Sequence, residues 1–436
     1  MEKIVALCKR RGFIFPGSEI YGGLNGTWDL GPLGVSLSHN LKNQWWRRMV
    51  YERNDVVGLD SSILYHAKVW EASGHVSSFT DPLIECKVCH ERFRADHTKE
   101  IEEHAKTHPS TGSGQADEWT EVKQFNLMFK TYVGPIDNEN NKTYLRPETA
   151  QGIFINFDNV IKTSRMKIPF GIAQIGKGFR NEITTGNFLF RVREFEMMEL
   201  EFFVKPGEDK QWFDYWRNER LKWYFGLGIK KEHIKLIDLP KKDIAHYSKG
   251  TSEIWYDWPF MGYGELEGIA NRGDYDLSQH AKHSGKEILY FDENTKERFV
   301  PYVIEPSVGV GRAMLAFLID SYCEDKDRVI LKLHPKLAPV KVAVFPLLAN
   351  KEELVSLAKK IYSDLKKSVD GVVAFDDRGN IGKRYFSQDE IGTPFCVTVD
   401  FQSLEDKKVT VRDRDTTKQE RVLIDNLEKY FLEKLN

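Results

Sequence analysis

Cysteine is scarce in this chain, and long apolar runs are missing. The 436 residues include five cysteines, too few and too scattered for a disulfide framework, which indicates a reducing compartment. No apolar stretch approaches the length of a membrane-spanning helix, and the N-terminal segment lacks the apolar core and cleavage site of a signal peptide. We therefore expect a cytoplasmic protein with no membrane partner.

Neither sign of charge is in excess. Lysine and arginine number 63 against 65 acidic residues, so no global positive field points to a polyanionic partner. Two common nucleotide-binding loops are also missing. Nothing fits the P-loop spacing, and residues 262–268, GYGELEG, have the wrong glycine spacing for a dinucleotide site and lie in a strand-like context. If the protein binds a nucleotide, arginines on a sheet must hold the phosphates.

Residues 172–203 contain charged side chains along two extended segments. The first segment places Gln174, Arg180 and Glu182 on one face at a period of two. The second is aromatic enough to predict a long strand, and residues 183–188, ITTGNF, suit a loop between the two. We predict an antiparallel hairpin with a charged face. Its arginines favour forked binding of phosphate or carboxylate over a merely solvated face.

A second cluster is found in residues 304–320, IEPSVGVGRAMLAFLID. An acidic residue is followed by a glycine-spaced loop and then by an apolar helix with Arg312 in its first turn. Gly309 and Gly311 allow a ligand to approach the backbone closely, and the helix N-terminus with Arg312 favours an anion. An ordinary helix entry is the alternative.

The chain divides into two regions that differ in their pattern of predicted strands and helices. Residues 1–333 mix long strands with Trp- and Arg-rich helices and carry a polar insert at about 84–120. After a Pro-flanked boundary, residues 335–436 alternate strands with amphipathic helices, which predicts a compact α/β domain.

The insert has the ligand spacing of a structural zinc site. Cys86 and Cys89 form a C-x2-C pair, and His104 and His108 follow after fourteen residues as H-x3-H. His90 and His97 compete as ligands, and the histidine-bearing stretch also fits an exposed helix. We therefore predict Zn²⁺ on these four residues and leave the exposed helix as the alternative.

In sequence order, these segments resemble the motifs of the class II aminoacyl-tRNA synthetases. Residues 28–46, WDLGPLGVSLSHNLKNQWW, resemble motif 1 at the dimer interface, the charged hairpin resembles motif 2, and GVGR resembles motif 3. The stretches RADH, LRPETAQG and FRNEI resemble the homodimeric glycyl-tRNA synthetase family. The C-terminal hundred residues resemble the anticodon-binding domain that the glycyl, histidyl, prolyl and threonyl enzymes share.

The resemblance implies an α+β fold, in which helices flank an antiparallel sheet and a C-terminal α/β anticodon-binding domain follows. It also implies a homodimer that attaches glycine to tRNA(Gly) with ATP and Mg²⁺, through a glycyl-adenylate. Glycine's own carboxylate is then the nucleophile, so positioning and charge stabilisation can replace a side-chain base.

By the same resemblance, the nucleotide site surrounds the charged hairpin. Arg180 would hold the α-phosphate and Glu182 the adenine edge, while Phe195 stacks beneath the adenine and Arg312 covers its other face. Glu265 would bind Mg²⁺, although a strand-edge carboxylate is the alternative. Arg180, Arg312 and Glu265 are the implied catalytic residues. The implied nucleotide-binding residues are Arg180, Asn181, Glu182, Phe190, Arg191, Val192, Arg193, Glu194, Phe195, Glu265, Leu266, Gly309, Val310, Gly311 and Arg312.

Glycine has no side chain that an enzyme could bind, so its recognition must rest on the ammonium and the carboxylate. Glu148, Glu305 and Ser307 would hold the ammonium, and Arg94 of RADH the carboxylate, unless Arg94 is only a solvated residue of the insert. The implied glycine-binding residues are Arg94, Glu148, Phe195, Glu196, Met197, Met198, Glu199, Glu305, Pro306, Ser307, Val308 and Gly309.

Two other functions compete with this one. A non-catalytic accessory subunit should lose the motif arginines, but Arg180 and Arg312 are present. A sister synthetase for Pro, Thr or Ser is disfavoured because Glu148 and Glu305 together suit a small substrate. The sequence gives less evidence for tRNA binding. Lys383 beside Arg384 and Tyr385 fits both a nucleic-acid contact and a solvated helix start.

Overall fold

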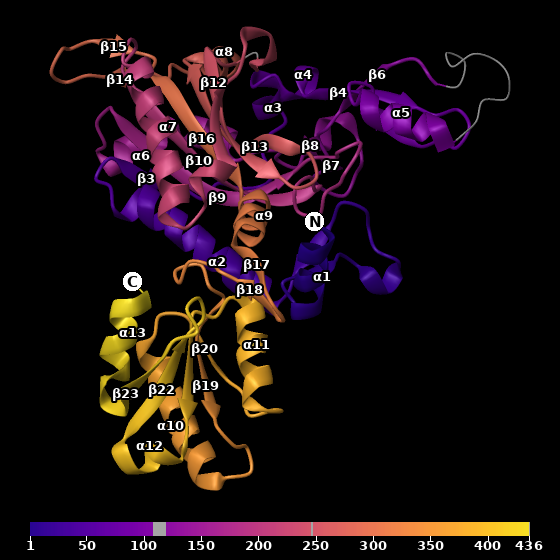
Figure 1. Cartoon of the computed structure of the whole chain (residues 1–436). Helices are drawn as coiled ribbons and strands as arrows, with labels where there is room; N and C mark the ends of the chain where they lie inside the picture. The colour runs from indigo at the N-terminus through magenta and orange to yellow at the C-terminus, as the bar shows by residue number, and fades with distance from the viewer. Residues whose placement is uncertain (108–118, 246, 436) are drawn as a thin grey trace.

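The computed structural model describes residues 1–107, 119–245 and 247–435 and forms two bodies, each built on its own sheet (Figure 1). In the larger body, seven strands run in the order β11-β12-β13-β16-β10-β9-β3. All neighbours are antiparallel except β3 and β9. These strands are β3 (Val56–Gly58), β9 (Phe170–Phe179), β10 (Glu194–Val204), β11 (Ile234–Asp238), β12 (Gly250–Trp258), β13 (Gly262–Gly273) and β16 (Tyr302–Gly309).

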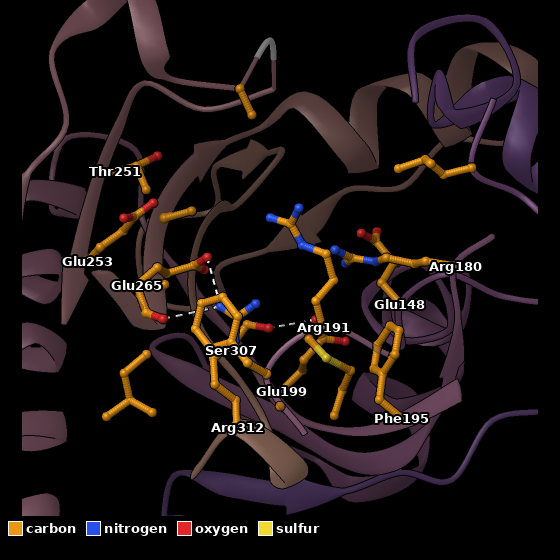
Figure 2. Close-up of a pocket in the computed structure, with 18 of the residues that line it drawn as sticks. Glu148, Arg180, Arg191, Phe195, Glu199, Thr251, Glu253, Glu265, Ser307 and Arg312 are labelled. Carbon is orange, nitrogen blue, oxygen red and sulfur yellow. Dashed lines mark hydrogen bonds and ion pairs between the residues drawn. The ribbon is translucent and has the colours of Figure 1, made fainter. Parts of the chain in front are cut away.

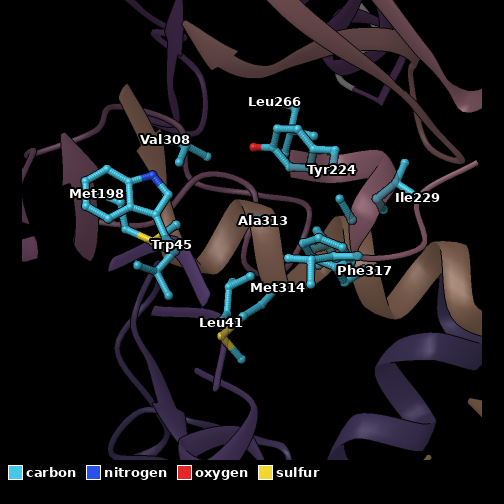
Figure 3. Close-up of a cluster of buried hydrophobic side chains, with 14 of the residues drawn as sticks. Leu41, Trp45, Met198, Tyr224, Ile229, Leu266, Val308, Ala313, Met314 and Phe317 are labelled. Carbon is cyan, nitrogen blue, oxygen red and sulfur yellow. The ribbon is translucent and has the colours of Figure 1, made fainter. Parts of the chain in front are cut away.

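Helices cover the two faces of this sheet unequally. One face packs on the main hydrophobic core, where Leu41 and Trp45 of one helix and Phe317 of another meet Met198 and Val308 of the sheet (Figure 3). The opposite face is covered at one end only. The main core uses α1 (Glu2–Arg11), α2 (Pro32–Trp46), α7 (Asp209–Gly226) and α9 (Val310–Ser321), and the opposite face uses α6 (Ala150–Ser164) and α8 (Tyr275–Ser284).

Smaller elements join these layers. The insert forms a three-stranded sheet, β5-β4-β6, that projects to one side with a helix of its own (Figure 1). It consists of β4 (Thr80–Glu85), β5 (Arg92–Arg94), α5 (Thr98–Thr107) and β6 (Lys123–Asn126). The other small elements are β1 (Ile14–Pro16), β2 (Trp28–Leu30), α3 (Lys68–Ala72), α4 (His75–Ser78), β7 (Lys130–Tyr132), β8 (Lys142–Tyr144), β14 (Tyr290–Phe291), β15 (Arg298–Phe299), β17 (Tyr322–Asp325) and β18 (Arg328–Leu331).

The C-terminal body is a five-stranded mixed sheet in the order β20-β19-β21-β22-β23, parallel on one side and antiparallel on the other. Its strands are β19 (Val340–Pro346), β20 (Val372–Phe375), β21 (Phe395–Val399), β22 (Lys408–Asp413) and β23 (Gln419–Leu423). Its helices are α10 (Glu352–Ser368), α11 (Ile381–Ile391), α12 (Phe401–Asp406) and α13 (Leu427–Leu435). Both sheets agree with the predicted fold class.

The charged hairpin is present, but its connection is longer than predicted. β9 ends at Phe179 and β10 starts at Glu194, so residues 180–193 join the strands. The backbone N–H groups of Asn181 and Arg193 donate to the carbonyls of Leu127 and Gly26, outside the hairpin. The prediction that strand alternation aligns Arg180 and Glu182 with Gln174 is therefore wrong, because both charged residues lie beyond the strand. Among the described residues, no helix has the length and apolar character of a membrane span.

Candidate active site

A cavity of about 460 Å³ opens on the part of the large sheet that helices leave uncovered. Its floor consists of β10, β13 and β16, and the 180–193 connection forms one wall. Figure 2 shows Glu253 and Glu265 on one side of this cavity and Arg180 and Arg191 on the other. The cavity thus separates a carboxylate side from a guanidinium side.

Strand alternation decides which predicted residues reach this cavity. On β10, Phe195, Met197 and Glu199 line it, whereas Met198 is buried in the main core and Glu196 pairs with Lys42 at 2.9 Å. The same alternation on β16 brings Glu305, Ser307 and Gly309 to the cavity and turns Pro306 and Val308 away.

The guanidinium side is formed by the 180–193 connection. The Arg180 Nε donates to the Pro147 carbonyl at 3.1 Å, and the guanidinium lies 5.4 Å from the centre of the Phe195 ring. Burial raises the pKa of Glu182, while Arg180 and Arg191 oppose the shift. This wall therefore presents two cations and an aromatic face toward the cavity.

The opposite side combines Arg312 with two carboxylates. Arg312 Nη1 lies 2.8 Å from Glu265 Oε2, and the guanidinium lies 4.5 Å from the centre of the Phe190 ring. Glu253 also lines the cavity, and its pKa is raised by burial and by the neighbouring Glu265 charge. Two carboxylates that repel each other in this way form a donor set suited to a hard divalent cation.

The carboxylates at the deep end have pKa values shifted in opposite directions. Burial disfavours the charge of Glu148, but His75, 3.3 Å away, and Arg272 together hold its pKa below the usual range. Burial raises the pKa of Glu305 to about 8, with Arg272 opposing and Glu199 adding to the shift. The Ser307 hydroxyl donates to Glu199 at 2.7 Å. This end is therefore an acidic, desolvated site suited to a small cation.

Arg272 is the main residue that the sequence analysis missed. It lies 2.8 Å from Glu305 and 2.7 Å from Asp276, its guanidinium stacks 3.9 Å from the centre of the Tyr247 ring, and it is 2% exposed. Strand parity gave no signal for Arg272, because the cavity-lining residues of β13 include both parities, such as Glu265 and Leu266. Arg272 contacts Glu305 of the lining and is not itself part of it. The unpredicted lining residues are Phe79, Asp81, Leu127, Leu189, Leu239, Asp243, Ala245, Tyr247, Thr251, Glu253, Gly268, Ile269 and Ala270.

Most of the predicted site residues converge on this cavity. Its lining includes Arg94, Glu148, Arg180, Glu182, Phe190, Arg191, Val192, Phe195, Met197, Glu199, Glu265, Leu266, Glu305, Ser307, Gly309, Gly311 and Arg312. The remaining predicted residues lie outside the cavity lining. Arg193 donates to the carbonyls of Asn25 and Glu182, Glu194 pairs with Lys177, and Val310 is in the main core. Asn181, Glu196, Met198, Pro306 and Val308 complete this second group.

The insert brings three of its four predicted metal ligands together. The ligand atoms of Cys86, Cys89 and His104 lie within 4.8 Å of one another, and the His104 Nε2 is 3.3 Å from the Cys89 Sγ. The other ring nitrogen, Nδ1, is 3.1 Å from a carboxylate oxygen of Glu91. This is the usual arrangement of a metal-binding histidine, whose second nitrogen donates to a carboxylate. His108 lies outside the described residues.

Comparisons with known proteins agree with this geometry. Residues 129–322 match the family model of the tRNA synthetase class II core domain (G, H, P, S and T), and residues 341–434 match that of the anticodon-binding domain. The chain is 55% identical to glycine–tRNA ligases of Thermobifida fusca, Streptomyces coelicolor and Caldanaerobacter subterraneus subsp. tengcongensis. Each alignment covers 100% of this chain and 98% of the relative.

Proposed function

Since this chain belongs to the glycine–tRNA ligase family of class II aminoacyl-tRNA synthetases, we propose that its cavity joins glycine to ATP and then glycylates tRNA(Gly). The observation that carries the proposal is a single cavity with a buried acidic end, suited to an ammonium, next to a wall of guanidinium groups, suited to phosphates.

Glycine binds at the acidic end. Its ammonium group meets Glu148, Glu199 and Glu305, which lie on separate elements and converge on one volume. Arg94 is placed at the cavity wall to receive the carboxylate. Larger amino acids are excluded by steric closure of this end, which discriminates better than grading the size of an apolar pocket.

ATP binds across the guanidinium side, with the adenine next to Phe195 and the α-phosphate at Arg180. A glycine carboxylate oxygen attacks the α-phosphorus, the bond to pyrophosphate breaks, and Arg180 stabilises the charge that develops. In the second step a hydroxyl oxygen of the terminal ribose of the tRNA attacks the glycyl carbonyl, and AMP leaves. Arg312 holds the nucleotide from the opposite side.

Mg²⁺ accompanies ATP in this enzyme class, and Glu253 with Glu265 would hold it. The fit rests on the position of the two carboxylates in the cavity lining, where burial and the Glu265 charge raise the pKa of Glu253. When held there, the ion would supply charge neutralisation for the phosphates.

Four further assignments complete the proposal. Residues 1–333 are the catalytic domain and residues 335–436 bind the anticodon, in agreement with the family models. The chain acts as a homodimer through residues 28–46, which light scattering in solution would test. It works in the cytoplasm, where a chain with five scattered cysteines and no disulfide framework is expected. Zn²⁺ binds the group of Cys86, Cys89 and His104, because zinc prefers thiolate and imidazole ligands.

ATP–pyrophosphate exchange tests the function directly. Glycine should support exchange, and the other proteinogenic amino acids should not. Arg180→Ala and Arg312→Ala should each lower exchange by about a hundredfold or more, because each removes a cation that acts on the nucleotide. The exposed Arg47 provides the matched control, and Arg47→Ala should retain activity. Near-normal exchange in Arg180→Ala would reject the nucleotide assignment.

A further inference from the structure

The insert has almost no hydrophobic core. Among residues 83–106 and 119–122, whose burial the structure describes, Cys86 is the sole apolar side chain that is fully buried. None of these residues is a buried member of the five hydrophobic core clusters. A module that buries so little apolar surface needs a cross-link to hold one conformation.

The three candidate ligands lie where such a cross-link would be effective. Cys86 and Cys89 form the turn between β4 and β5, closed by hydrogen bonds from the Cys86 N–H to the Glu91 carbonyl and from the His90 N–H to the Cys86 carbonyl, both 2.9 Å. His104 comes from α5, and its ring packs 4.6 Å from the Phe93 ring of β5. A metal at this turn ties the helix to the hairpin.

The same hairpin carries a wall of the active-site cavity. Its register sets Glu85 opposite Arg92 next to the turn and Leu83 opposite Arg94, so Arg94 lies two register pairs further along, at the end of β5. Arg94 Nη1 donates to Asp81 at 2.7 Å, and its Nη2 donates to Asp96 at 2.7 Å. Both Arg94 and Asp81 line the cavity. The hairpin therefore connects the cysteine turn directly to the wall of the cavity.

We propose that Zn²⁺ bound by Cys86, Cys89 and His104 positions Arg94 for the substrate carboxylate. The ligands are positioning residues, since they lie outside the cavity lining and act through the β4–β5 register. Arg94 is the residue that touches substrate, which rests on the function proposed for the cavity. Loss of the metal frees the turn and α5, and Arg94 is then no longer held at the wall by the hairpin.

Metal content is the first test. Full-length protein purified without chelator should contain about one zinc ion per chain by elemental analysis, and Cys86→Ser, Cys89→Ser and His104→Ala should contain none. Glu91→Gln should weaken zinc affinity by about 10- to 100-fold, because it removes the carboxylate at the second ring nitrogen. Cys323→Ser and His283→Ala, outside the cluster, are controls that should keep the metal. Metal-free wild-type protein, or a Cys86–Cys89 disulfide in its place, would overturn the proposal while leaving glycine-dependent exchange intact.

A double-mutant cycle tests the coupling. Arg94→Ala should raise the glycine KM in zinc-loaded enzyme, and Cys89→Ser should raise it through the same residue. The double variant should then match Arg94→Ala within about a factor of two, because effects that pass through one side chain do not add. Added Zn²⁺ should rescue Glu91→Gln and leave Arg94→Ala unchanged. Full multiplication of the two single effects would overturn the coupling even if zinc is bound.

Discussion

Two buried carboxylates at the glycine end have pKa values shifted in opposite directions by the groups around them. Glu148 accepts from the Gln151 amide at 3.0 Å and lies beside His75, so cationic and donor groups favour its charge. Burial and the nearby Glu199 carboxylate oppose ionisation of Glu305 and raise its pKa, although Arg272, 2.8 Å away, favours its charge. Although both groups are buried, Glu148 is therefore charged before glycine binds, whereas Glu305 ionises when a cation binds next to it.

Glu148→Gln should weaken glycine binding selectively. The substitution keeps the shape of the side chain and removes its charge, and loss of one partner of a desolvated charge pair costs about 2 to 5 kcal/mol. We expect kcat/KM for glycine to fall by roughly thirty-fold or more, with a much smaller change in the ATP KM. Exchange kinetics with glycine and ATP varied separately measure this. Glu353→Gln, on an exposed face of α10, is the control. The reverse pattern would move Glu148 to the nucleotide.

Glycine affinity should rise as pH increases toward 8. The raised pKa of Glu305 keeps this group protonated below about 8, whereas the bound ammonium favours the carboxylate. Each pH unit below the pKa should therefore weaken glycine binding by about tenfold, approaching a plateau above it. The glycine KM measured across this range should follow that curve in the wild type and flatten in Glu305→Gln. A wild-type profile that is already flat would contradict the assignment.

At the scale of elements, the β9–β10 pairing determines where the aromatic face lies. Gly178 is the register partner of Phe195, and a Cβ on this glycine would lie 2.6 Å from the Phe195 ring and 3.3 Å from the Pro147 carbonyl. The absence of a side chain therefore lets the ring lie flat against its neighbour strand. A bulky residue here would displace the ring into the space that we assign to adenine.

Gly178→Ala should consequently raise the ATP KM more than the glycine KM. The backbone of Gly178 has no positive φ, so the substitution acts through the ring and not through backbone strain. Gly186→Ala is the matched control, since a Cβ there meets nothing within 4 Å. Equal effects of the two changes on ATP would show that the ring is not displaced.

At the scale of the whole molecule, a buried carboxylate joins the two bodies. Asp389 of α11 accepts from Arg328 of β18 at 2.9 Å and from Arg412 of β22 at 2.8 Å.

The three residues of the expected cation cluster on α11, Lys383, Arg384 and Tyr385, differ in their exposure to solvent. Arg384 is 2% exposed and donates to the Gly379 carbonyl at 2.8 Å, and the Tyr385 hydroxyl bonds Thr398. Lys383 alone of the three is exposed.

Lys383→Ala should therefore weaken tRNA use and leave glycine activation unchanged. A lysine that contacts a phosphate contributes roughly uniform affinity, and its loss should reduce the slope of log affinity against log salt by about one. Aminoacylation measured over a salt series, with exchange in parallel, separates the two steps. Lys360→Ala on α10 should alter neither. An unchanged salt slope would remove Lys383 from the tRNA surface.

The sequence by itself determined the features that depend on local periodicity. The strand-to-helix step from β16 to α9, the amphipathic α10 and the exclusion of the common phosphate loops all follow from spacing along the chain. The C-x2-C pair followed by His104 was visible for the same reason. Order along the chain and residue type sufficed, since neighbours in these patterns are also neighbours in space.

Only the tertiary structure decided which side chains share the cavity. Glu196 and Met198 were expected beside Glu199, but strand alternation turns them to the opposite face. Arg272, more than a hundred residues beyond Glu148, joins the acidic end because β13 pairs with β16. The 180–193 connection is held by its own backbone hydrogen bonds and also by two to distant segments, from Asn181 to the Leu127 carbonyl and from Arg193 to the Gly26 carbonyl. Contacts between remote segments depend on sheet order and register, which no local pattern encodes.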